Sequence, residues 1–139
     1  MKKIIVYTDG GARGNPGPAG IGVVITDAAG NTLHESSAYI GETTNNIAEY
    51  EALIHALEDL KMFGDLRDTE IEVRMDSELV VRQMQGAYKV KEPSLKERFG
   101  RVAQLRLSQT PNLTFVHVPR EQNARADELV NEAIDSATT

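Results

Sequence analysis

The chain has 139 residues, of which 40% are hydrophobic and 26% are charged, and its formal net charge is −6. It has no cysteine, which excludes disulfides and thiolate metal sites. The length favours one globular domain, residues 1–139. The apolar stretch at the start is too short for a signal peptide, and no run approaches the roughly 20 apolar residues of a membrane span. We therefore expect a cytoplasmic protein without a membrane partner.

Three strands are predicted first, because β-branched and apolar residues fill three segments that short turns separate. Strands and helices then alternate. The predicted elements are strands over 2–8, 20–27 and 32–41, a helix over 45–64, a strand over 70–75, helices over 77–86 and 94–107, a strand over 113–118 and a helix over 123–137. Short links favour an antiparallel meander at the start, and the later helices favour parallel crossovers. Asn46 is expected to cap the first helix and Gly64 to end it. The predicted fold class is α/β.

Four acidic residues lie in or beside apolar patterns, where an unpaired carboxylate is costly. Asp9 and Asp76 end the first and fourth strands. Glu49 lies on the buried stripe of the first helix, and Asp127 lies at the edge of the apolar face of the last helix. Parallel pairing would bring Asp9 and Asp76 together at the carboxyl end of the sheet, where open α/β sheets bind ligands. Clustered carboxylates repel, and hard divalent cations such as Mg²⁺ remove that conflict.

Each of these carboxylates also has a purely structural explanation. Asp9 could bond the amides of a glycine-rich turn, and Glu49 could be the acid of a capping box. Asp76 could cap the following helix, and Asp127 could pair with Arg125 or Arg120. Composition and spacing alone leave the structural and the metal-binding interpretations equally open.

A basic segment interrupts the acidic chain. Residues 82–106 contain seven basic and two acidic residues. Such a patch is compatible with a phosphate backbone on one face. It is also what an exposed amphipathic helix with surplus positive charge would show, and charge alone favours this second interpretation.

Four motifs occur in order along nearly the whole chain: "TDGGARGNPGPAG", "TTNNIAEYEAL", "MDSELVVRQ" and "NARADELVNEA". With this order and spacing the chain resembles type 1 ribonuclease H. The resemblance implies a five-stranded mixed sheet whose first three strands are antiparallel and whose fourth and fifth run parallel to the first, with helices on both faces. It also implies an endoribonuclease that hydrolyses the RNA strand of RNA–DNA hybrids with two ions of Mg²⁺ or Mn²⁺ and leaves 5′-phosphate ends.

The resemblance also implies roles for particular residues. The catalytic and metal-binding acids would be Asp9, Glu49, Asp76 and Asp127. The substrate contacts would be Gly10, Gly11, Asn15, Thr44, Asn45 and Asn46. The two glycines would lie beside the RNA sugar, where a 2′-hydroxyl separates RNA from DNA.

The chain departs from many relatives in two places. It lacks their basic, Trp-rich protrusion, so either hybrid affinity is lower or Lys89, Lys91 and Lys96 supply it. The loop before the last acid lacks their histidine, and Arg120 and Glu121 are the nearest candidates to replace it. This shorter pattern is similar to that of archaeal and some bacterial members.

Two alternative functions stay open. A nuclease of the same fold could also cut double-stranded RNA, and a non-catalytic module could bind the hybrid without cutting it. Loss of one or more acids would mark a non-catalytic module, and all four acids are present. We expect the protein to act as a monomer.

Overall fold

The computed structural model describes residues 2–139 and confirms the α/β class and the predicted order of elements. Strands β1 (Lys2–Ala12), β2 (Gly17–Asp27) and β3 (Thr32–Thr43) form an antiparallel meander. Strands β4 (Thr69–Met75) and β5 (Leu113–His117) add two parallel strands beyond β1. The sheet order is β3-β2-β1-β4-β5, so β1 is the central strand.

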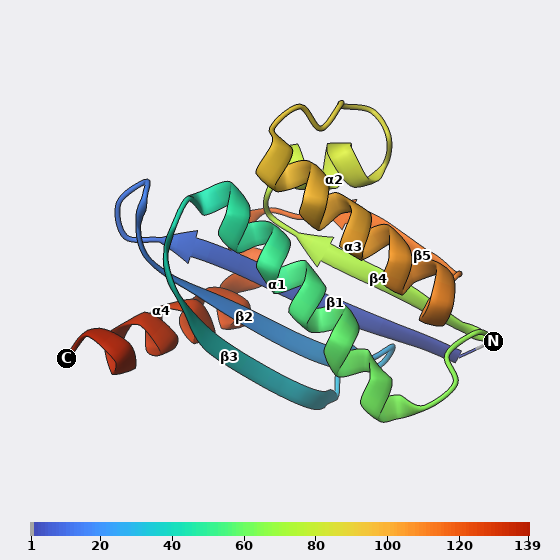
Figure 1. Ribbon diagram of the computed structural model, residues 1–139. Coiled ribbons are helices and arrows are strands. Elements are labelled where there is room, and N and C mark those ends of the chain that lie inside the picture. Colours follow the sequence, from blue (N-terminus) through green and yellow to red (C-terminus); the bar gives the residue numbers. More distant parts are fainter. Residues whose placement is uncertain (1) are drawn as a thin grey trace.

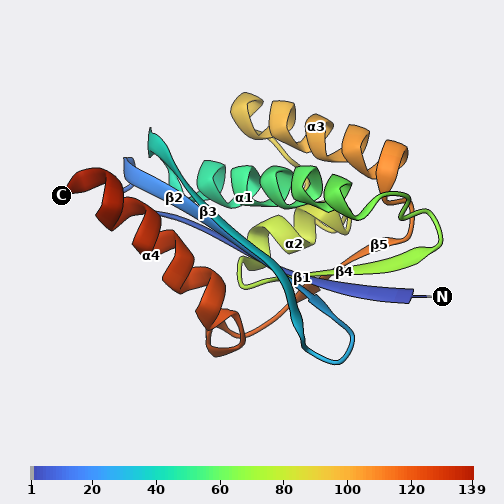
Figure 2. The same cartoon turned by 90° about the horizontal axis from the view of Figure 1, so that it is seen from below.

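Helices cover both faces of this sheet. Helices α1 (Asn45–Asp59), α2 (Glu78–Met84) and α3 (Pro93–Gln109) lie on one side, and α4 (Ala124–Thr138) lies on the other (Figures 1 and 2). The larger part of the core lies between α1, α3 and the sheet, because the apolar side chains of β4 alternate toward that side. Within residues 2–139, no helix is long and apolar enough to cross a membrane.

Strand β1 continues beyond the predicted end, so the prediction that Asp9 ends it is wrong. Asp9 pairs with Gly22, and the β1–β2 pairing runs on to Ala12 and Ala19. Glycines weaken a strand pattern in sequence, yet their backbones pair as well as any other. The extended hairpin therefore places Asp9 inside the sheet rather than in a turn.

Thr44, and not Asn46, caps helix α1. Thr44 has an extended backbone, and its hydroxyl accepts a hydrogen bond from the N–H of Ile47 at 3.3 Å. Asn46 is already the second residue of the helix. The predicted helix end at Gly64 is five residues too late, because α1 ends at Asp59; Gly64, with φ of 79°, ends the 3-10 turn η1 (Leu60–Phe63) that follows α1.

Candidate active site

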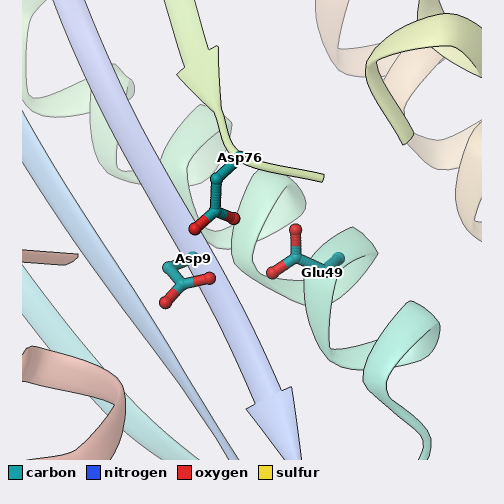
Figure 3. A group of neighbouring side chains, drawn as sticks. All are labelled: Asp9, Glu49 and Asp76. Atoms are coloured by element: carbon teal, nitrogen blue, oxygen red, sulfur yellow. The ribbon is translucent and has the colours of Figure 1, made fainter. Parts of the chain in front are cut away.

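Three acidic side chains meet at the carboxyl end of the sheet. Asp9 comes from β1, Asp76 directly follows β4, and Glu49 comes from α1. One carboxylate oxygen of each lies within 4.8 Å of the others. The three side chains point toward one another (Figure 3). This confirms that the parallel pairing of β1 and β4 brings Asp9 and Asp76 together.

Two glycines let the acid-bearing helices approach the sheet closely. A Cβ atom on Gly10 would lie 2.1 Å from the carbonyl oxygen of Ala48, and one on Gly22 would lie 2.2 Å from that of Ala126. Any larger residue would push α1 away from β1, or α4 away from β2. These two glycines thus have a packing role that sequence reasoning missed. They allow the helices of Glu49 and Asp127 to lie close to the sheet.

Glu49 does not belong to a capping box. Its Oε1 accepts the N–H of Gly10 at 2.6 Å, so the side chain reaches across to β1. Its Oε2 is buried and has no hydrogen-bond partner among residues 2–139. A buried carboxylate oxygen without a partner is unfavourable unless a proton or a cation neutralises it.

The electrostatics of the cluster follow from burial and crowding. Asp9 is 8% exposed and Glu49 is 6% exposed. Burial, and then the charge of Asp76, raise the pKa of Asp9 to about 7. Burial and the neighbouring Asp9 raise the pKa of Glu49 well above its ordinary range. Burial also raises the pKa of Asp76, while the positive charge of Arg120 opposes that rise.

Asp127 faces the same space from the first turn of α4. It lines a cavity of about 600 Å³ together with the three clustered acids, and its charge contributes to the raised pKa of Asp9. We call this space the acidic cavity. Asp127 lies outside the group of three whose oxygens are within 4.8 Å of one another. The alternative in which Asp127 pairs with Arg125 does not hold, because Arg125 pairs with Glu35 at 2.9 Å.

The donor set fits a hard divalent cation. Each clustered residue offers carboxylate oxygen, which Mg²⁺ and Mn²⁺ prefer over nitrogen or sulfur. The unpartnered Oε2 of Glu49 is one observation that calls for such an ion. The raised pKa values of Asp9 and Glu49 agree with this, because burial and neighbouring carboxylates disfavour the charged forms that a cation would stabilise.

Three of the predicted substrate residues form a corner beside the acidic cavity, whose wall includes Asn45: Asn15, Thr44 and Asn45. The N–H of Asn45 donates to Oδ1 of Asn15 at 3.0 Å, and Oδ1 of Asn45 accepts the N–H of Ala12 at 2.8 Å. Thr44 is held as the cap of α1. Asn46 lines the acidic cavity, as do Gly10 and Gly11. The hairpin and the start of α1 are therefore fixed to each other.

The basic segment divides into two kinds of residue. Arg98 pairs with Glu51 at 2.7 Å, and Arg101 pairs with Glu58, so both tie α3 to α1. The predicted lysines, which we call the lysine group, are exposed and have no ion-pair partner within the described part of the chain: Lys89, Lys91 and Lys96. Lys89 and Lys91 line a second hollow of about 540 Å³ that also includes Asn46. The two hollows therefore adjoin at Asn46.

The two candidates for the missing histidine are placed differently. Arg120, in the 3-10 turn η2 (Arg120–Asn123), lines the acidic cavity and lies close enough to Asp76 to affect its pKa. Glu121 is exposed and, among the described residues, is not part of the cavity wall.

Sequence reasoning missed one side of the cavity. Arg13 lines it and is held to α4 by Asp135 at 2.7 Å and by Oδ1 of Asn131 at 3.1 Å. Asp127, Asn131 and Asp135 follow one another at four-residue spacing, so they share one face of α4. This polar stripe, which lies beside the apolar face of α4, was the sequence pattern that could have indicated this side of the cavity.

A mixed sheet in this order, with carboxylates gathered at its carboxyl edge, defines a ribonuclease H-like protein. The sequence matches the family described as reverse transcriptase-like over residues 7–133. The fold is similar to that of LC11-RNase H1, isolated from compost by a metagenomic approach and solved in complex with an RNA/DNA hybrid. That chain is 77% identical, with a TM-score of 0.96, over 98% of this chain and 99% of the other.

Two further similar proteins come from an archaeon and a bacterium. Ribonuclease HI of Halobacterium salinarum is 44% identical over 97% of this chain and 66% of its own length. A bifunctional protein of Mycobacterium tuberculosis is 47% identical over 97% of this chain but only 36% of its own length. The chain thus spans about a third of the mycobacterial relative. It belongs to the type 1 ribonuclease H family.

Proposed function

We propose that this chain is an endoribonuclease that hydrolyses the RNA strand of RNA–DNA hybrids. The observation that carries the proposal is the group of three acids with an unpartnered Glu49 oxygen at the carboxyl end of the sheet. Its context is a family member that is 77% identical and was solved with such a hybrid. Loss of an acid would have favoured a non-catalytic module, and all four predicted acids line one cavity.

Four residues would hold the metal ions: Asp9, Glu49, Asp76 and Asp127. We propose two ions, Mg²⁺ or Mn²⁺. When bound, such ions would supply an activated water and would stabilise the charge on both the attacking and the leaving oxygen. The water oxygen would bond to phosphorus and lose a proton, while the bond from phosphorus to the ribose 3′-oxygen breaks and that oxygen takes up a proton. The products are a 5′-phosphate and a 3′-hydroxyl.

The other residues bind and orient the nucleic acid. Asn15, Thr44 and Asn45 form the fixed corner described above, and we propose that they hold the DNA strand through phosphate and minor-groove contacts. Gly10 and Gly11 lie in the wall of the cavity, where the backbone allows close approach of an RNA sugar. The lysine group extends this surface with exposed positive charge.

We propose that residues 1–139 act as a single catalytic domain, as a cytoplasmic monomer. The absence of cysteine from the sequence is compatible with a reducing compartment. Sedimentation of the purified chain, alone and with hybrid, would test the monomer.

One gel assay tests the activity. The chain is incubated with end-labelled hybrid, duplex RNA and duplex DNA, each with Mg²⁺, with Mn²⁺ and with EDTA. We expect cleavage of the RNA strand of the hybrid, 5′-phosphate ends, and no cleavage in EDTA. Cleavage of duplex RNA at a similar rate would broaden the assignment to a nuclease for both substrates. Binding of hybrid without cleavage in any metal would overturn it.

A further inference from the structure

The segment that links β5 to α4 is tied to the sheet at two points. The N–H of Val118 donates to the carbonyl oxygen of Met75 at 2.9 Å. Nδ2 of Asn123 donates to the carbonyl oxygen of Thr8, also at 2.9 Å. Thr8 and Met75 are the last residue pair of the β1–β4 ladder, and each directly precedes one of the clustered acids. The segment is therefore attached at the two carbonyls immediately behind the acidic cavity.

Asn123 stands where a helix cap would stand but does not act as one. An asparagine directly before a helix usually has an extended backbone and accepts a hydrogen bond from a helix N–H. Asn123 has φ of −115° and ψ of 21°, and within the described residues its side chain makes no capping bond. The amide is turned toward β1 instead.

This arrangement is not the one that stability alone would favour. Asn123 is 1% exposed, and its Oδ1 has no hydrogen-bond partner in the part of the chain that the structure describes. An unpaired buried amide oxygen opposes folding, whereas a capping bond would stabilise α4. The side chain thus makes no capping bond to α4. Instead it makes a directional hydrogen bond to Thr8, the residue before Asp9.

We propose that Asn123 is a positioning residue of the active site, which acts through Asp127. The proposal rests on the proposed function. Asp127 lies four residues after Asn123, one helical turn along α4. Gly22 permits α4 to lie close to β2, but close packing is not directional. The hydrogen bond from Asn123 to Thr8 is directional, and it sets how the first turn of α4, and with it Asp127, lies against Asp9.

The test compares two variants with a matched control. Asn123→Leu keeps the side-chain size and removes the amide, and Asn123→Ala removes both. The control is Asn112→Ala, because Nδ2 of Asn112 makes the same type of bond, to the carbonyl oxygen of Arg67 at 2.7 Å, before the amino ends of β4 and β5 and so at the opposite end of the strands from the acids. Each protein is assayed for kcat and KM on the hybrid, and its affinity for Mn²⁺ is measured by calorimetry without substrate.

We expect both Asn123 variants to lose kcat by on the order of 10- to 100-fold, the range for a slightly misplaced catalytic group. Their KM should stay within about twofold of the parent, and their affinity for Mn²⁺ should fall. Asn112→Ala should keep all three parameters. In an Asp127→Asn background, Asn123→Leu should have little further effect, because two substitutions that act through one group are not additive.

Three results would overturn the proposal. The first is a folded Asn123→Leu protein with the parental kcat and Mn²⁺ affinity. The second is a double variant, Asp127→Asn with Asn123→Leu, whose loss of kcat equals the product of the losses in the two single variants. The third is failure of both Asn123 variants to fold, which would show that the residue serves stability. If the parent itself does not cleave hybrid, the proposed function fails, while the Mn²⁺ titrations still decide whether Asn123 positions the acids.

Discussion

The acidic cavity and the lysine group adjoin at Asn46, but their side chains are held in different ways. Asp9 and Glu49 are nearly buried, on elements that pack together through Gly10. The lysines are exposed, and within residues 2–139 they have no ion-pair partner. Core packing thus fixes the groups that need exact geometry, whereas groups that only need charge can stay mobile. Substitutions in the two regions should therefore affect kcat and KM separately.

The largest effect is expected from the three clustered acids. Asp9→Asn, Glu49→Gln and Asp76→Asn should each reduce hybrid cleavage by several orders of magnitude, because an amide cannot supply the anionic oxygen that a hard cation needs. The volumes are nearly unchanged, so circular dichroism should show a folded protein. Initial rates on labelled hybrid measure the loss. Full activity in any one of the three would remove that residue from the site.

A smaller loss is expected for Asp127→Asn, because Asp127 lies outside the group of three. We expect measurable residual activity, most visibly with Mn²⁺. Pre-steady-state kinetics should show a slower burst, since the change affects the chemical step. A loss as complete as that of Asp9→Asn would show that all four acids are equivalent.

The lysine group should govern binding. Replacing Lys89, Lys91 and Lys96 together by Gln should raise KM and leave kcat within about twofold. The salt dependence of binding should flatten, by a slope of roughly 0.7–0.9 for each lost phosphate contact. Arg98→Gln is the matched control, because Arg98 is engaged with Glu51 and should affect stability rather than KM. A fall in kcat at constant KM would place the lysines elsewhere in the reaction.

Arg120→Ala should lower turnover by a factor of about 10² or less. This is the bottom of the range for a general acid or base. The reason is that Arg120 lines the cavity beside Asp76, from an exposed turn. The phase after the burst should slow, and the burst itself should not. Glu121→Ala is the control, since Glu121 is exposed and outside the described cavity wall. Equal kinetics in both variants and the parent would show that neither residue replaces the histidine.

The smallest effect is on stability, and it depends on pH. The pKa of Asp9 rises from 3.8 to about 7 on folding, so ionising Asp9 opposes folding. The free energy of unfolding of the metal-free protein should therefore fall as pH increases from about 4 to about 7. Asp9→Asn should be more stable than the parent in urea with EDTA at pH 7.5, and should gain little at pH 4. If Asp9→Asn and the parent are equally stable at both pH values, the ionised carboxylates do not destabilise the metal-free protein.

Much of the fold and of the candidate site could be predicted from the sequence, because the patterns that indicate them are local. Alternating and helical apolar patterns identified every strand and helix, with errors at their ends. Four motifs identified the family and the acids. The order of strands and crossovers was enough to predict that Asp9 and Asp76 would meet.

Other features depend on contacts between distant segments, which no local pattern contains. The role of Gly10 depends on how closely Ala48 approaches it, and the role of Asn123 depends on the carbonyl of Thr8. The division of the basic segment into paired arginines and unpaired lysines depends on the packing of α3 against α1. Local sequence determined which elements form and which acidic residues are candidates for the site. Only the tertiary structure decided which side chains are held in place, because burial and pairing arise when separate elements pack together.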